Sequence, residues 1–164
     1  MDSLLPPEIV DLARRVVEEN TAAGRKVTLA ESCTGGMVAG AITEIPGSSA
    51  VLDRSYVTYS NEAKMGDLGV DSDIIEAFGA VSVACVYAMA KGALERSGAD
   101  VAVAISGIAG PDGGSELKPV GTVVFARMVR GDEEPTAEER LFADTGRSGV
   151  RLQATLCALE LLLP

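Results

Sequence analysis

The chain has 164 residues, of which 47% are hydrophobic and 23% are charged. This length fits one domain, and the composition favours a compact α/β protein over a disordered one. The formal net charge of −10 opposes non-specific binding to nucleic acid, whose affinity comes largely from neutralising phosphates with Lys and Arg. The sequence contains no histidine, which excludes Ser-His-Asp and Cys-His catalysis and most catalytic zinc sites.

No stretch approaches the roughly 20 apolar residues that a membrane span needs, and the N-terminus lacks the basic-then-apolar pattern of a signal peptide. We therefore expect a cytoplasmic protein with neither a membrane nor a nucleic acid as partner. The three cysteines, Cys33, Cys85 and Cys157, are odd in number and far apart, so we expect neither a disulfide framework nor a metal site. The sequence permits a monomer or a homo-oligomer equally.

Apolar residues at helical spacing predict an amphipathic helix over 7–23, and a strand-type apolar run follows at 27–30. The segment Glu31-Ser-Cys-Thr-Gly-Gly36 then turns into a second helix that runs to about residue 45. Such a junction leaves free N–H groups at the helix start, which favour an anionic ligand or developing negative charge. Alternatively, Thr34 only caps the helix, and the glycines only allow close packing.

A Pro-Gly turn at 46–47 carries Ser48 and Ser49, and a strand is predicted over 53–59. Ser60 or Asn61 can cap a helix that holds Lys64 in its first turn. There the helix dipole and partial burial both favour a neutral amine, which can act as a base. The alternative is a solvated surface lysine. We hypothesise that this short segment delivers a hydroxyl nucleophile, a phenol and an amine to one amide-cleaving site.

Further along, helices are predicted over 71–78 and from Ser82 to about residue 97, and an apolar strand covers 100–106. The Gly- and Pro-rich loop at 107–119 leaves the carboxyl end of that strand, where ligands of open α/β sheets collect, so we expect it to be functional. Strands are predicted at 120–129 and 138–143. A final helix follows Arg147.

Several segments in the right order resemble the CinA C-terminal-domain family, from about residue 7 to 163. The matching segments are Glu31-Ser-Cys-Thr-Gly-Gly36, Pro46-Gly-Ser-Ser49, Val57-Thr-Tyr-Ser-Asn-Glu-Ala-Lys64, Gly79-Ala-Val-Ser82, Ser106-Gly-Ile-Ala-Gly-Pro-Asp-Gly-Gly114 and Lys118-Pro-Val-Gly-Thr122. The resemblance implies an α/β protein with a three-layer α/β/α sandwich around a mixed sheet of about five strands, formed by residues 1–164 as a single domain.

The resemblance also implies hydrolysis of the carboxamide of nicotinamide mononucleotide (NMN) to nicotinic acid mononucleotide and ammonia, a step of pyridine nucleotide recycling. No cofactor is implied. The implied catalytic residues are Ser49 as nucleophile with Tyr59 and Lys64, and Ser48 is the rival nucleophile. The implied substrate-binding residues are Glu31, Ser32, Thr34, Gly35, Gly36, Ser48, Ser106, Gly107 and Arg147. At Arg147 the family's Gly-Asp-Arg appears as Asp144-Thr-Gly-Arg147, with one residue more.

Two other functions remain open at the level of the sequence. One is a second kind of amidase, with Cys33 as nucleophile, Glu31 as base and Lys64 as electrophilic partner. The other is a nucleotide-binding or competence-damage-associated module without turnover. A complete Ser49, Tyr59 and Lys64 set argues against the module, because a pure binder does not need those three groups.

Overall fold

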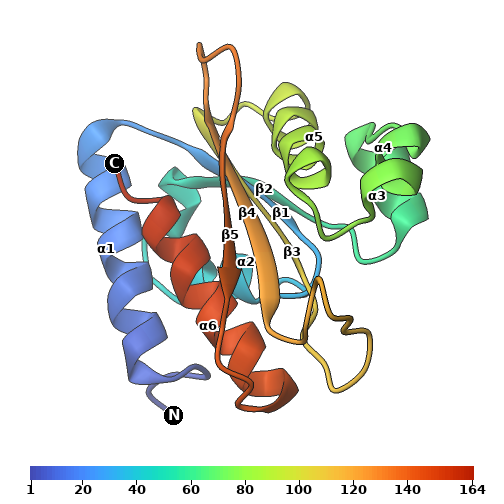
Figure 1. The fold of residues 1–164 in the computed structure, drawn as a ribbon. Coiled ribbons are helices and arrows are strands. Elements are labelled where there is room, and N and C mark those ends of the chain that lie inside the picture. Colours follow the sequence, from blue (N-terminus) through green and yellow to red (C-terminus); the bar gives the residue numbers. More distant parts are fainter.

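The computed structural model describes all residues 1–164. It confirms an α/β fold in which helices cover both faces of a mixed five-stranded sheet (Figure 1). In chain order the elements are α1 (Pro7–Ala23), β1 (Val27–Glu31), α2 (Met37–Thr43), the 3-10 turn η1 (Ser48–Ala50), β2 (Leu52–Val57), α3 (Asn61–Leu68), α4 (Ser72–Phe78), α5 (Val83–Glu95), β3 (Val101–Gly107), β4 (Thr122–Val129), β5 (Thr136–Leu141) and α6 (Gly146–Leu161).

The strand order of the sheet is β2-β1-β3-β4-β5. Strand β1 pairs in parallel with both β2 and β3, whereas β4 pairs antiparallel with β3 and with β5. The carboxyl ends of the three parallel strands therefore lie at one edge of the sheet. Ligands of open α/β sheets collect outside that edge.

Each face of the sheet has its own apolar core. On one face, α1, α2 and α6 pack on branched side chains such as Val101, Val103 and Ile105 of β3. On the other face, α5 packs on Ala102 and Ala104 of the same strand. Because alternate residues of a strand point to opposite faces, this one apolar strand serves both cores. In Figure 1, α1 and α6 lie on one side of the sheet and α3, α4 and α5 on the other.

Two serines begin the helices that flank the carboxyl edge. The Ser60 hydroxyl accepts from Ala63 N–H at 3.0 Å, and the Ser82 hydroxyl accepts from Cys85 N–H at 3.2 Å. Each satisfies an N–H group that the helix itself cannot bond. Of the two residues predicted to cap the helix that holds Lys64, Ser60 is the cap, and it fixes Lys64 in the first turn of α3.

Strand β5 begins and ends two residues earlier than the sequence predicts. It lies at the edge of the sheet and most of its residues are exposed or only partly buried. An edge strand with charged side chains shows little hydrophobic alternation, so the pattern does not define its register. No helix in the structure is long and apolar enough to span a membrane.

Helix α3 is held against α5 by a close approach at Gly92. A Cβ atom at this position would clash with the backbone carbonyl of Leu68, the last residue of α3. We predict that Gly92→Ala lowers the free energy of unfolding by about 1–3 kcal/mol, because two helices would have to move apart. Urea denaturation measures this.

Gly40→Ala is the matched control, because Gly40 lies in α2 with open space where its Cβ would stand. We expect it to leave stability unchanged or to raise it by up to about 1 kcal/mol. Equal effects of the two substitutions would contradict the packing described here.

Candidate active site

The turn after β1 is organised by the buried carboxylate of Glu31. Its oxygens accept from the hydroxyls of Thr34 at 2.7 Å and Ser55 at 3.3 Å. They also accept from the backbone N–H groups of Val38 and Ala39 at 3.0 and 3.1 Å. The residue before α2 offers no side-chain cap, so Glu31 satisfies the first turn of this helix in its place. Glu31 and Thr34 thus hold the turn, and neither lines the cavity described below.

Gly35 and Gly36 have φ angles of +58° and +97°, in the left-handed region that favours glycine. Both let the chain reverse before α2, and the missing Cβ at Gly35 lets Arg151 of α6 approach closely. Arg151 donates to the carbonyl oxygens of Cys33 at 3.0 Å and Thr34 at 3.3 Å. Both glycines shape the turn, but neither lines the cavity.

Lys64 is the largest buried charged residue at the carboxyl edge, with only 1% of its surface exposed. Its Nζ atom donates to Ser32 Oγ at 3.0 Å, to the Thr58 carbonyl at 2.9 Å and to the Tyr59 carbonyl at 3.0 Å. Ser32 follows β1 directly, and Thr58 and Tyr59 follow β2. The parallel pairing of the two strands therefore brings the hydroxyl and the amine together.

Burial lowers the pKa of Lys64, because the low-dielectric surroundings disfavour the ammonium form. No carboxylate forms an ion pair with it. A neutral amine has two N–H bonds and one lone pair. Two of its three partners are carbonyl oxygens, which can only accept, so the lone pair is left for the Ser32 hydroxyl. In this state Ser32 donates to Lys64, as a nucleophile does to its base.

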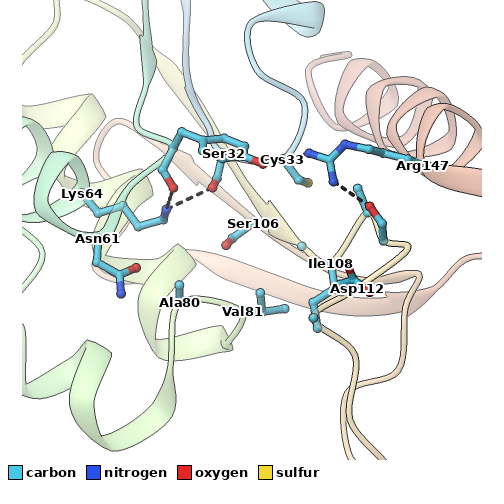
Figure 2. A pocket seen from close by; sticks show the side chains of 15 residues that line it. Ser32, Cys33, Asn61, Lys64, Ala80, Val81, Ser106, Ile108, Asp112 and Arg147 are labelled. Carbon is cyan, nitrogen blue, oxygen red and sulfur yellow. Dashed lines mark hydrogen bonds between the residues drawn. The ribbon is translucent and has the colours of Figure 1, made fainter.

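A cavity of about 260 Å³ opens beside the Ser32–Lys64 contact (Figure 2). The loop after β3, the segment between α4 and α5, and the start of α6 complete its wall. It is lined by Ser32, Cys33, Tyr59, Asn61, Lys64, Ala80, Val81, Ser106, Gly107, Ile108, Ala109, Gly110, Asp112, Gly113 and Arg147. The predicted site residues Ser106 and Gly107 are thus brought to the same cavity as Lys64. No group of Cys, Asp and Glu side chains gathers as a candidate metal site.

Arg147 joins two parts of the cavity wall. Its guanidinium donates to the Gly110 carbonyl at 2.7 Å and to the Tyr59 hydroxyl at 2.8 Å. The structure therefore places both residues at the site, as the sequence predicts, despite the extra residue before Arg147. Because the phenol oxygen accepts from Arg147, the O–H of Tyr59 remains available to donate to a ligand.

Ser48 and Ser49 lie at the amino ends of the parallel strands, opposite the carboxyl ends where Lys64 lies. They form η1, which precedes β2 and lies beside the start of β1, where Val27 N–H donates to Val51 O at 2.8 Å. The six residues of β2 then span roughly 20 Å at about 3.3 Å per residue. Neither serine lines the cavity. The prediction that one of them shares a pocket with Tyr59 and Lys64 is therefore wrong, because a whole strand separates them.

The alternative set of Cys33, Glu31 and Lys64 is also incomplete. Cys33 lines the cavity, but burial raises the pKa of its thiol to about 11. The Glu31 carboxylate is occupied at the turn and does not contact the thiol. A cysteine nucleophile needs a lowered pKa or a base beside it, and Cys33 has neither.

Sequence reasoning missed three residues at or around the cavity. Asn61 lines it because it begins α3, directly beyond the carboxyl end of β2. Asp112 lies in the loop that we expect to be functional, but no signal separates it from its neighbours. Arg151 stands one helical turn after Arg147, and this i,i+4 spacing could have identified it as a second arginine on the same helix face.

Comparison with known proteins confirms the resemblance. Residues 9–164 match the family described as the CinA C-terminal domain. The Escherichia coli K12 protein named nicotinamide-nucleotide amidohydrolase PncC is 52% identical over 155 residues, which cover 94% of this chain and 93% of that protein. A Symbiobacterium thermophilum protein named putative competence-damage inducible protein is 52% identical over 145 residues, covering 85% of this chain but 34% of the relative.

A solved structure is similarly close. The competence/damage inducible protein CihA from Agrobacterium tumefaciens superposes with a TM-score of 0.94 at 51% sequence identity, covering 98% of this chain and 96% of that one.

The carboxylate of Glu31 gives a test of how the turn is held. We predict that Glu31→Gln lowers the free energy of unfolding by about 1–3 kcal/mol, because an amide presents donors to groups that are themselves donors. Glu18→Gln, on the exposed face of α1, is the control and should change stability by less than about 0.5 kcal/mol. Chemical denaturation of both variants measures the difference. An unchanged free energy of unfolding in Glu31→Gln would contradict this role.

Proposed function

The chain belongs to the CinA C-terminal domain family, and from that membership we propose that it hydrolyses the carboxamide of NMN to nicotinic acid mononucleotide and ammonia. The names of the relatives support this substrate. The single observation that carries the chemistry is the 3.0 Å contact between Lys64 Nζ and Ser32 Oγ in a cavity. Release of nicotinic acid mononucleotide would place the enzyme in the recycling of pyridine nucleotides.

In the first half of the reaction, Ser32 is the nucleophile and neutral Lys64 is the base. Nζ takes the hydroxyl proton as Oγ attacks the carboxamide carbon and forms a tetrahedral intermediate. When this intermediate collapses, the C–N bond breaks and Nζ returns the proton to the departing nitrogen. Ammonia leaves, and the acyl group remains on Ser32 as an ester.

In the second half, water replaces ammonia. A water molecule gives a proton to Nζ and attacks the ester carbon, and the C–O bond to Ser32 then breaks. Ser32 takes the proton back from Nζ, and the acid that forms gives its remaining proton to solvent and leaves as the carboxylate. One amine thus serves both halves, which suits a chain that has no histidine.

Other cavity residues suit the remaining demands of this substrate. The oxyanion of each tetrahedral intermediate needs donors, and the Ser106 hydroxyl and the Cys33 N–H both lie at the cavity and donate to no other group. Arg147 keeps further N–H donors and its charge for the phosphate of the nucleotide. Tyr59, whose phenol is oriented by Arg147, can donate to the bound substrate.

We predict that Ser32→Ala lowers kcat for ammonia release from NMN by about 10³-fold or more, because the nucleophile is lost. Ser49→Ala is the matched control, since it removes the same hydroxyl at the far edge of the sheet, and it should stay within about twofold of the unsubstituted protein. A coupled ammonia assay measures both. An active Ser32→Ala beside an inactive Ser49→Ala would overturn this assignment.

We predict that kcat/KM rises with pH as Lys64 loses its proton, with an apparent pKa below the ordinary lysine value of 10.5 because burial lowers the pKa of this amine. Lys64→Arg, which stays protonated, should lower kcat by about 10²–10⁴-fold. The pH profile and the variant's rate at one pH check this. Activity retained in Lys64→Arg would contradict the role of a base.

The same shift in the pKa of Lys64 has a stability consequence. Between the lowered pKa and 10.5, the unfolded chain holds a proton that the folded chain lacks. The free energy of unfolding contributed by this group therefore rises with pH across that window. Lys64→Met should remove this rise, which urea denaturation at several pH values would detect.

A further inference from the structure

The loop between β3 and β4 forms one part of the cavity wall and is a compact unit of its own. Ile108 bonds both Gly121 and Thr122 through the backbone, at 2.8 and 2.9 Å. Near its tip, Ser115 N–H donates to the Lys118 carbonyl at 2.9 Å, and Lys118 N–H donates to Ser115 Oγ at 3.1 Å. The loop therefore keeps its own shape, and Arg147 of α6 joins it to one side of the wall through the Gly110 carbonyl.

The segment between α4 and α5 forms the neighbouring part of the wall. It contributes Ala80 and Val81, which together with Ile108 of the loop form an apolar floor. Figure 2 shows these three side chains on the side of the cavity away from Ser32, with Ser106 between. The floor is thus built from two segments that are far apart in the sequence.

One side chain ties these two segments together. Lys118 Nζ donates to the carbonyl of Phe78, the last residue of α4, at 3.2 Å, and to the carbonyl of Val81 at 2.5 Å. Lys118 is only partly exposed and pairs with no carboxylate. No other hydrogen bond joins the loop at 108–120 to the α3–α5 layer. A cation is also favoured at the carbonyl end of α4 by the helix dipole.

We propose that Lys118 is a positioning residue that holds the apolar floor of the cavity at a fixed separation from Ser32 and Lys64, so that a flat aromatic ring packs on the floor with its carboxamide at the hydroxyl. This rests on the proposed function, because the ring is that of NMN. Lys118 donates to the carbonyl of Val81, and its own loop carries Ile108. Without this hydrogen bond, the two segments that form the floor can move independently.

The two lysines of the site should be distinguishable by kinetics. The floor contacts the ring in the bound substrate and in the transition state alike, so a loosened floor raises KM and changes kcat little. The loss of Lys64 or Ser32 acts on kcat instead. The pH dependence of kcat should follow the titration of Lys64 alone. A substitution at Lys118 should therefore leave it unchanged.

The test is Lys118→Met, which keeps the length of the side chain and removes its donors. We expect KM for NMN to rise about tenfold, kcat to stay within about threefold and the pH profile of kcat to be unchanged. Lys91→Met is the matched control, because Lys91 of α5 pairs with Glu134 away from the cavity, and it should behave as the unsubstituted protein. Wild-type KM in Lys118→Met, or a loss confined to kcat, would overturn the proposal.

Amide hydrogen exchange gives a second readout that does not depend on turnover. In Lys118→Met, exchange should quicken at residues 79–83 and 108–113 and stay unchanged in β1, whereas unchanged exchange in the first two segments would overturn the proposal. If Lys118→Met unfolds, Lys118→Arg keeps the charge at α4 but shifts the donors. Its KM for NMN should then exceed that of the unsubstituted protein with kcat little changed, and an unchanged KM would count against the proposal.

The two proposals can fail separately. If the unsubstituted protein releases no ammonia from NMN, the proposed function fails, and hydrogen exchange still tests whether Lys118 holds the floor. If the unsubstituted protein is active and Lys118→Met matches it in both KM and exchange, the role of Lys118 fails alone.

Discussion

A buried amine without a carboxylate partner is the constraint on which the site depends. Burying a charged lysine is costly, and the protein offers Lys64 two carbonyl oxygens and a hydroxyl in place of a counter-ion. The carbonyls fix the direction of two N–H bonds, so the remaining position on the nitrogen faces Ser32. Burial thus lowers the pKa of Lys64 while the two carbonyls orient its nitrogen toward one hydroxyl, which is the arrangement that the proposed base needs.

The sheet supplies this geometry. Because β1 and β2 are parallel neighbours, the residues that follow them meet at one edge, and the cap at Ser60 then brings Lys64 back over that edge. Glu31 holds the turn beneath Ser32 by capping α2 from inside. The loop after β3 completes the cavity through Arg147 on one side and, in our proposal, Lys118 on the other. In the proposed mechanism the nucleophile Ser32 thus follows the end of β1 and its base Lys64 comes from the first turn of α3, while loops complete the space for the substrate.

Most of the fold could be predicted from the sequence because hydrophobic periodicity and caps mark its helices, and apolar runs mark its central strands. The bounds of the edge strand β5 were predicted two residues too late, because an exposed strand shows little hydrophobic alternation. The presence of Lys64, Tyr59, Ser106 and Arg147 at one site was also predicted. The hydroxyl beside Lys64 was not predicted: the family resemblance implied Ser49, whereas the order of strands in the sheet, which local patterns do not determine, brings Ser32 to Lys64 instead. Glu31 and Thr34 were predicted to bind substrate, but their polar atoms bond each other and α2.

Trapping the acyl intermediate identifies the side chain that attacks the carboxamide. The protein would be mixed with NMN, quenched in acid and digested with trypsin, and the peptide at 27–54, which contains both Ser32 and Ser49, would be fragmented in a mass spectrometer. We expect the mass of the nicotinoyl mononucleotide group on Ser32. Finding it on Ser49 or Cys33 would show that Ser32 is not the nucleophile.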